Sequence, residues 1–203
     1  MKELLKKVTE GQNLTREEAA KAMDMILEGT ASPVLVSAFL TALRMKGETV
    51  DEIVGCTEMM KSKGGSVKLD TDEYIDFVGT GGDGANSFNI STTSMFVCAA
   101  AGVTVAKHGN RAASSKSGAS DLLEALGANI MLEPKQVEQC INETGMGFMN
   151  AMKFHKAMKN VGPIRKEIGV RTIFNMLGPL SNPSNASRQV IGVFSPEKVS
   201  VFA

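Results

Sequence analysis

The sequence has no excess of charge of either sign, because 22 lysines and arginines balance 22 aspartates and glutamates among 203 residues. Proteins that coat nucleic acid or an anionic membrane usually carry a basic excess. We therefore expect neither a nucleic-acid partner nor a membrane partner, and any cationic patch must be local. Hydrophobic residues make up 43% of the chain, which is enough for a core and argues against disorder.

Cysteine is scarce, with three widely spaced residues at Cys56, Cys98 and Cys140. An odd number of cysteines, without the spacing of metal ligands, is typical of buried thiols in a reducing cytosol. Long hydrophobic runs are missing too, since none approaches the roughly 20 residues that span a bilayer. The amphipathic N-terminus lacks the apolar stretch of a signal peptide. We expect a soluble, cytoplasmic protein.

The first 65 residues carry only helix signals. Thr15 to Glu18 and Thr49 to Glu52 fit capping boxes, in which a hydroxyl and a carboxylate cap the start of a helix. Ser32-Pro33 is typical of another helix start, and Gly64-Gly65 of a helix end. The sequence predicts an all-helical domain over 1–65, and its simplest role is packing or dimerisation.

From residue 74 onward, short apolar runs alternate with helical patterns, which is typical of a parallel sheet wrapped by helices. The patterns predict a strand over 74–78, a helix over 91–101, a strand over 103–106, a helix over 118–126, a short strand over 129–132 and a helix over 134–144. Residues 153–178 return to helix signals, with Pro163 opening one helix and Gly178-Pro179 closing another, before a buried strand over 189–194. The predicted fold class is α/β.

The last helix signal begins at Ser195 and the sequence stops at Ala203, after about two turns. A helix that short is an awkward end for a sheet-wrapping domain. We therefore expect that the chain is truncated and that its α/β domain is incomplete.

Residues 79–84 read Gly-Thr-Gly-Gly-Asp-Gly, directly after the apolar run 74–78. Glycine at this density lets the backbone turn sharply and approach a ligand closely. A helix start at 89–92 follows, and the two features together predict a nest of N–H donors for a phosphate. Neither Gly-x-Gly-x-x-Gly nor the P-loop pattern fits. An ordinary tight turn is the alternative.

A second segment, 107–115, brings two cations and two hydroxyls to the end of the apolar run 103–106. Lys107 and Arg111 would be solvated surface charges in the simplest interpretation. Their place at a strand end beside Ser114 and Ser115 favours anion binding instead. Two such segments in one small domain indicate a ligand with phosphates at both ends.

With these two segments, three further blocks resemble the anthranilate phosphoribosyltransferase family: 121–127, 157–159 and 165–183. The resemblance covers essentially all 203 residues in order. It implies a small helical domain, 1–65 completed by about 160–185. It also implies a larger α/β domain with a mainly parallel sheet, 70–159 and 186–203.

The resemblance further implies a homodimer through the helical domain. The implied reaction transfers the phosphoribosyl group of phosphoribosyl pyrophosphate, with Mg²⁺, to the amine of anthranilate. Two alternatives stay open: a pyrimidine nucleoside phosphorylase-like enzyme, and a non-catalytic dimerisation or binding fragment.

Residue by residue, the resemblance implies a set of ligand contacts. The phosphoribosyl pyrophosphate contacts are Gly79, Gly82, Asp83, Ser87, Asn89, Ile90, Ser91, Thr92, Lys107, His108, Gly109, Asn110, Arg111, Ala112, Ala113, Ser114, Ser115 and Ala119. The anthranilate contacts are Gly79, Asn110 and Arg165, and the Mg²⁺ ligand is Ser91, whose simpler role is a helix N-cap. Arg165 can hold a carboxylate with a two-pronged hydrogen bond. His108 and His155 receive no proton-transfer role, and no residue is assigned as catalytic.

The sequence departs from the family in three places. Asn150-Ala151-Met152 replaces the Phe-Ala-Pro run that helps to line the acceptor channel, and Ala119 stands where relatives often have serine. The adjacent acidic pair that relatives use for Mg²⁺ lies beyond the end of this chain. We therefore expect an incomplete metal site and an inactive 203-residue chain.

Overall fold

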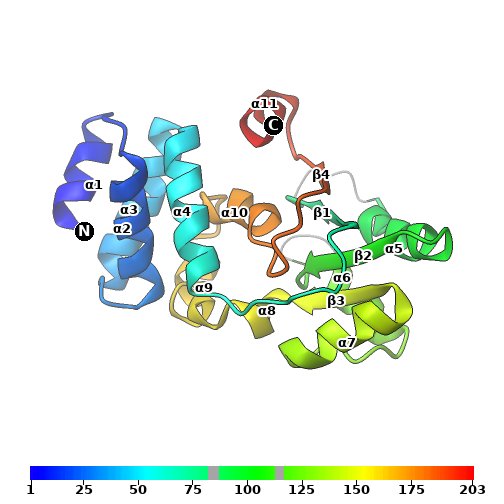
Figure 1. Cartoon of the computed structure of the whole chain (residues 1–203). Coiled ribbons are helices and arrows are strands. Elements are labelled where there is room, and N and C mark those ends of the chain that lie inside the picture. The colour runs from blue at the N-terminus through cyan, green and yellow to red at the C-terminus, as the bar shows by residue number, and fades with distance from the viewer. Residues whose placement is uncertain (82–86, 113–116) are drawn as a thin grey trace. The chain divides into compact units, whose positions relative to one another are not determined.

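The structure is a computed structural model that describes residues 1–81, 87–112 and 117–203. The chain divides into two compact units (Figure 1). The helical unit contains Met1–Gly64 and His155–Ser181, and the α/β unit contains Gly65–Phe154 and Asn182–Ala203. The predicted α/β fold class with a helical part is confirmed.

The helical unit consists of α1 (Lys2–Thr9), α2 (Arg16–Leu27), α3 (Pro33–Lys46), α4 (Val50–Ser62), the 3-10 helix η1 (Lys156–Asn160), α9 (Gly162–Ile168) and α10 (Phe174–Leu180). Both predicted capping boxes are present, at the starts of α2 and α4, and the hydroxyl of Ser32 caps α3. These local signals therefore set where the helices begin. The predicted helix end at Gly178-Pro179 is wrong, because α10 accommodates Pro179 in its last turn and ends at Leu180.

Helices α2 and α4 approach each other closely at Gly55. A Cβ atom on Gly55 would lie 2.1 Å from the carbonyl oxygen of Arg16, so only glycine fits there. The buried Glu52 carboxylate lies near the start of α4 and accepts hydrogen bonds from the backbone N–H groups of Leu14, at 2.9 Å, and Thr49, at 2.8 Å. Lys46 pairs with the same carboxylate at 3.0 Å. The N-terminal segment is thus fixed to α4 by a fully hydrogen-bonded buried charge.

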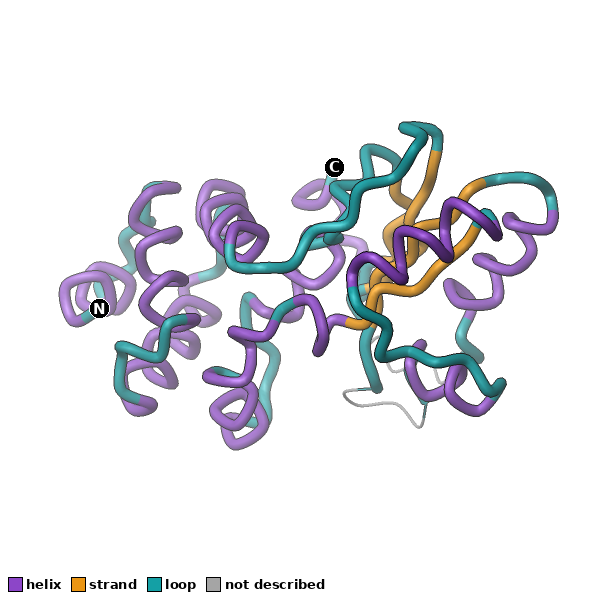
Figure 2. Tube along the Cα trace, turned by 60° about the horizontal axis from the view of Figure 1, so that its bottom comes forward, coloured by secondary structure: helices purple, strands orange, loops and turns teal. Residues whose placement is uncertain are grey.

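The α/β unit contains β1 (Tyr74–Gly79), α5 (Ile90–Ala100), β2 (Thr104–Gly109), α6 (Ala119–Ala125), α7 (Pro134–Thr144), β3 (Met146–Asn150), α8 (Ala151–Phe154), β4 (Gln189–Gly192), the 3-10 helix η2 (Pro196–Lys198) and α11 (Val199–Phe202). Its four strands, which are orange in Figure 2, pair in the order β3-β2-β1-β4. Every pairing is parallel. Helix α5 packs on β1 and β2, and α7 packs on β3. The core below α7 is a cluster of Val67, Ala106, Val137, Ile141, Met149 and Phe154.

The predicted strand over 129–132 is wrong, and the third strand is β3 instead. Within 129–132 the side chain of Asn129 accepts a hydrogen bond from the N–H of Met131 at 3.0 Å, which favours a turn over a ladder. β3 contains Gly147, which has a low strand propensity. The missing side chain has a packing reason, because a Cβ there would lie 2.4 Å from a side-chain carbon of Ile141 on α7.

Two other strands differ from the predicted bounds. β2 continues past the expected end at residue 106, so Lys107, His108 and Gly109 belong to the strand and not to the loop after it. Pairing with β3 reaches Gly109 and accounts for the extension. β4 ends at Gly192, before the expected residue 194, and its pairing with β1 ends at the same point. All three cysteines are free, but only Cys56 is buried, so the expectation of three buried thiols is wrong for Cys98 and Cys140.

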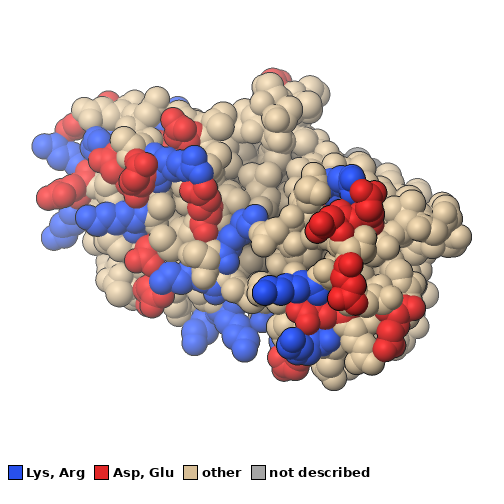
Figure 3. Space-filling view, in the orientation of Figure 1, with Lys and Arg blue, Asp and Glu red and all other residues tan. Residues whose placement is uncertain are grey.

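Charged side chains of both signs are interspersed over the face of the molecule in Figure 3. The helices that the structure describes include none that is both long enough and apolar enough to span a bilayer.

Candidate functional site

The two predicted anion-binding segments begin at the same edge of the sheet. Gly79 ends β1 and Gly109 ends β2, and because the strands are parallel, both carboxyl ends lie at one edge. β1 has β2 on one side and β4 on the other, so the direction of the chain crossovers reverses between β1 and β4. Open α/β sheets bind ligands at such a switch point, outside the carboxyl ends of the strands.

The start of the first segment is fixed to β4. The N–H of Thr80 donates to the carbonyl oxygen of Gly192 at 2.9 Å, and the Thr80 hydroxyl accepts from the N–H of Phe194 at 2.9 Å. Gly81 follows with φ +66°, a left-handed conformation that glycine adopts at little cost. Of the predicted contacts, Gly82 and Asp83 lie outside the described residues.

The end of the first segment leads into α5, whose first residue is Ile90. Ser87 is exposed and Ile90 is 55% exposed, whereas Ser91 is half-buried and Thr92 is buried. The residues at the start of this helix are therefore accessible, while the N–H groups of Ile90 and Thr92 donate to the carbonyl oxygens of Phe88 and Asn89. Helix N-termini of this kind attract anions.

Lys107 is a buried cation in the strand β2. Its side chain is 2% exposed, and its ammonium donates a hydrogen bond to the carbonyl oxygen of Phe77 on β1. Burial lowers the pKa of Lys107 to about 8, against the opposing attraction of the Asp76 carboxylate. Lys107 is therefore no solvated surface charge. The neighbouring His108 is buried as well.

Arg111 follows β2 and is exposed, but it is paired within the unit. Its guanidinium contacts Asp121 at 2.9 Å and Glu124 at 2.7 Å, both on α6. The adjacent Asn110 is exposed, and its side-chain oxygen accepts from the N–H of Arg111 at 2.8 Å. Ala113, Ser114 and Ser115 lie outside the described residues.

Asn89 connects the first segment to the residues that follow the second. Its side-chain amide donates to the hydroxyl of Ser117 at 3.2 Å and to the carbonyl oxygen of Gly118 at 3.4 Å. Asp121 then closes the second segment, because one of its oxygens accepts from the N–H groups of Ala112, at 3.0 Å, and Gly118, at 2.8 Å. These backbone hydrogen bonds lower the pKa of Asp121. Ala119 is the first residue of α6, directly after this closure.

Replacing Gly118 with alanine should disrupt the hydrogen bonds by which Asp121 holds the backbone of Ala112 and Gly118 together. A Cβ at Gly118 would lie 2.3 Å from the backbone nitrogen of Ala112, and a backbone atom cannot move aside as a side-chain end can. We expect Gly118→Ala to lower the free energy of unfolding by about 1–3 kcal/mol in urea denaturation. Gly192→Ala is the matched control, because its Cβ would have its nearest neighbour at 3.8 Å. Equal stability of the two variants would contradict the prediction.

The remaining predicted residue, Arg165, lies in α9 of the helical unit. Its guanidinium lies over the ring of Phe174, 5.1 Å from the centroid, in cation–π geometry. Burial lowers the pKa of Arg165. The structure thus brings together the described residues of the two anion-binding segments in one unit, and it holds Arg165 in the other.

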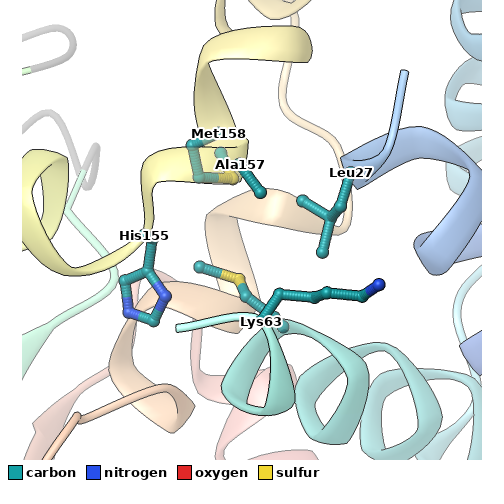
Figure 4. A pocket seen from close by; sticks show the side chains of 6 residues that line it. Leu27, Lys63, His155, Ala157 and Met158 are labelled. Carbon is teal, nitrogen blue, oxygen red and sulfur yellow. The ribbon is translucent and has the colours of Figure 1, made fainter. Parts of the chain in front are cut away.

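His155 lines a small pocket inside the helical unit, together with Leu27, Met60, Lys63, Ala157 and Met158 (Figure 4). Its Nε2 is 3.0 Å from the carbonyl oxygen of Ser181, and burial lowers the pKa of the imidazole. The empty volume is about 150 Å³, open solvent included. Because ligand pockets usually hold about 300 Å³ or more, this pocket alone is too small for an aromatic substrate.

The segment Asn150-Ala151-Met152 joins β3 to α8. Asn150 is buried, and its side-chain oxygen accepts from the N–H of Met152 at 3.0 Å. Met152 is 59% exposed. This segment is therefore a polar turn that is held by its own side chain.

Sequence reasoning missed several polar residues that support the site. Asp76 is fully buried in β1, and the side chain of Asn182 donates to the carbonyl oxygen of Ala106 at 3.0 Å. An aspartate inside an otherwise apolar strand was the available signal for Asp76. Nothing local indicated the role of Asp121, because its partners, the Arg111 guanidinium and two backbone N–H groups, lie nearby only after folding.

With this geometry in place, the chain can be compared with known proteins. A family model described as the glycosyl transferase family, a/b domain, matches residues 71–203, and one described as the helical bundle domain of that family matches residues 2–64. The chain belongs to this glycosyl transferase family.

Within the family, the similar proteins are anthranilate phosphoribosyltransferases. Those of Acetivibrio thermocellus and Nitrobacter hamburgensis are each 55% identical over 203 residues, and the chain covers 59% and 60% of their lengths. The crystal structure of the Thermus thermophilus enzyme matches with a TM-score of 0.92 at 46% identity, over 97% of this chain and 60% of that one. The Saccharomyces cerevisiae enzyme in complex with PRPP and Mg matches with a TM-score of 0.86 at 31% identity, over 93% of this chain and 56% of that one. The chain thus spans about 60% of the length of these curated relatives.

Proposed function

We propose that the chain is part of an anthranilate phosphoribosyltransferase and carries its phosphoribosyl pyrophosphate site. One observation carries the proposal: a glycine-rich segment and a segment with the cations Lys107 and Arg111 lie at the carboxyl ends of neighbouring parallel strands, and Asn89 connects the first to the residues that follow the second. A ligand with a phosphate at one end and a pyrophosphate at the other needs two such segments. The similarity to anthranilate phosphoribosyltransferases supports the same ligand.

In the proposed reaction, the bond between C1′ of the ribose and the pyrophosphate oxygen breaks, and a bond between C1′ and the amine nitrogen forms. The amine then loses a proton to water. An aromatic amine is already neutral near pH 7, so a strong base is not needed. The two anion-binding segments would position the donor and stabilise the leaving pyrophosphate, while Arg165 would orient the acceptor carboxylate.

Mg²⁺ belongs to the proposal as a counter-ion of the pyrophosphate, supported by the yeast relative in complex with PRPP and Mg. Ser91 would be a ligand, and it offers one neutral oxygen. The described residues include no group of three or more His, Cys, Asp or Glu side chains that could hold a metal ion. Since Mg²⁺ wants about six oxygen ligands, these residues do not make a complete site, and we assign no step to the ion.

Homodimerisation through the helical unit is also part of the proposal. Val34, Met45 and Val50 of this unit expose large hydrophobic side chains, at 78%, 82% and 54%. The zero net charge argues against nucleic acid and membranes as partners. Together with this enzyme class, we propose a location in the cytoplasm.

Ligand choice tests the proposal. We expect phosphoribosyl pyrophosphate with Mg²⁺ to raise the melting temperature of the chain, because a ligand that binds only the native state stabilises it. Thymidine with phosphate should leave the melting temperature unchanged. The reverse pattern would favour the pyrimidine nucleoside phosphorylase-like alternative, and no response to either pair would favour a non-catalytic fragment.

A further inference from the structure

Asp76 is a buried carboxylate at the centre of the sheet. It lies within β1, and its side chain is 0% exposed. One oxygen accepts from the N–H of His108 at 3.2 Å, and the other accepts from the side-chain amide of Gln189 at 3.2 Å. Because β2 and β4 flank β1, the carboxylate is hydrogen-bonded to both neighbours of the central strand.

The position of Asp76 matters because β1 and β2 pair only at their beginnings. The paired residues are Tyr74 with Thr104 and Ile75 with Val105. Backbone pairing between β1 and β2 stops before Asp76. There, the Asp76 side chain accepts a hydrogen bond from the backbone N–H of His108. The stretch of β2 that carries Lys107 is therefore held to β1 by the carboxylate of Asp76 and by the bond from Lys107 to Phe77.

Asp76 and Lys107 are also opposite charges buried in one layer of the unit. Burying either charge alone is costly, and an opposite charge nearby offsets the cost. Burial raises the pKa of Asp76, whereas a hydrogen bond from Asn182, the charge of Lys107 and hydrogen bonds from His108 and Gln189 act against that rise. For Lys107, the charge of Asp76 opposes the effect of burial on the pKa. Its strand neighbour His108 is the other titratable side chain close by in β2.

We infer that Asp76 is the positioning residue of Lys107, fixing the strand that carries it and supplying the counter-charge that keeps its ammonium protonated for a phosphate group. The anion-binding part of this inference rests on the proposed function. The coupling between the two side chains does not.

A purely structural carboxylate would make the same hydrogen bonds, so the test must separate charge from geometry. Asp76→Asn does so, because an asparagine oxygen can still accept from the N–H of His108 while the charge is gone. The amide of Gln189 can turn to present its oxygen to the new side chain. Gln189→Leu is the matched control, since it removes one hydrogen bond to Asp76 and keeps the charge.

The protonation of Lys107 can be followed directly by NMR. Lysines labelled with ¹³C at Cε are titrated in the 203-residue chain from about pH 6 to about pH 10. The Lys107 signal is assigned by its loss in Lys107→Met. We expect a midpoint of about 8 in the unchanged chain and in Gln189→Leu. Asp76→Asn should lower the midpoint by about one pH unit or more, and an unchanged midpoint would overturn the inference.

A double-mutant cycle covers the case in which Asp76→Asn folds poorly. If Asp76 acts as the counter-charge, Asp76→Asn should raise the unfolding equilibrium constant less in the Lys107→Met background than in the unchanged chain, and the two increases should differ by a factor of about ten or more. An equal loss in both backgrounds would mean that Asp76 acts only on the fold, which overturns the inference.

Binding of phosphoribosyl pyrophosphate to the same samples tests the anion-binding part. At about pH 8, Asp76→Asn should bind more weakly than the unchanged chain by about fivefold or more, and the difference should shrink at about pH 6. Comparing the two proteins at each pH cancels the titration of the ligand itself. If phosphoribosyl pyrophosphate leaves the Lys107 signal unchanged while the titration midpoints of the variants still differ, the proposed function is contradicted. The electrostatic coupling between Asp76 and Lys107 is then still supported.

Discussion

Replacing Lys107 with methionine in a version of the enzyme as long as its relatives should lower kcat/KM for phosphoribosyl pyrophosphate by about 100- to 1000-fold. Loss of one preorganised charge that stabilises a leaving anion has an effect of this size. Lys107 suits the role because it is buried beside the carboxyl edge of the sheet, where solvent screens little. Methionine keeps the unbranched side chain that fills the space next to Phe77.

Steady-state kinetics with both substrates varied would measure the effect. Lys135→Met is the matched control, because this lysine lies on α7 of the same unit and its side chain is 93% exposed. We expect the control to keep the kinetics of the unchanged enzyme. Equal kcat/KM values for the two variants would show that Lys107 only supports the strand.

Replacing Arg165 with alanine should raise the KM for anthranilate far more than the KM for phosphoribosyl pyrophosphate. A charge-assisted hydrogen bond contributes about 1.5–3 kcal/mol, which corresponds to about 10- to 150-fold. Within the described part of the chain, Arg165 has the Phe174 ring as its partner, and burial is the only cause of its lowered pKa. A half-buried guanidinium that has no ion pair with any described carboxylate is suited to binding an anionic group of a ligand.

Two further variants sharpen this experiment. Arg165→Lys keeps the charge but loses the two-pronged geometry, so its KM for anthranilate should lie between those of the unchanged enzyme and Arg165→Ala. Lys166→Ala removes an exposed neighbouring charge and should change neither KM. If Arg165→Ala raised both KM values equally, the arginine would be a structural residue of α9.

Local signals made most of the helical unit predictable. The capping residues at Thr15, Ser32 and Thr49 set the starts of three helices, because their hydroxyls cap the adjacent backbone N–H groups whatever the rest of the chain does. Helical periodicity alone does not show which segments share a unit. The association of residues 155–181 with the N-terminal helices depends on contacts that are distant in sequence.

The sheet was less predictable, because its strands depend on their neighbours. β3 was missed since Gly147 weakens the strand pattern, and the close approach of α7 that requires this glycine exists only in the folded unit. Lys107 was assigned to a loop because lysine is rarely buried. Asp76, which makes that burial tolerable, is 31 positions earlier in the sequence. A strand boundary that depends on such a distant pair is invisible to a local pattern.

The division of the helical unit into two chain segments has a consequence for its folding. Ile173 and Leu177 are fully buried in this unit, and α10 packs on α4. During synthesis the first four helices emerge well before these residues, which come after the whole of β1, β2 and β3. The N-terminal helices must wait with part of their core uncovered, and contacts between such distant segments form slowly. Completion of the helical unit is thus timed by the synthesis of the sheet that interrupts it.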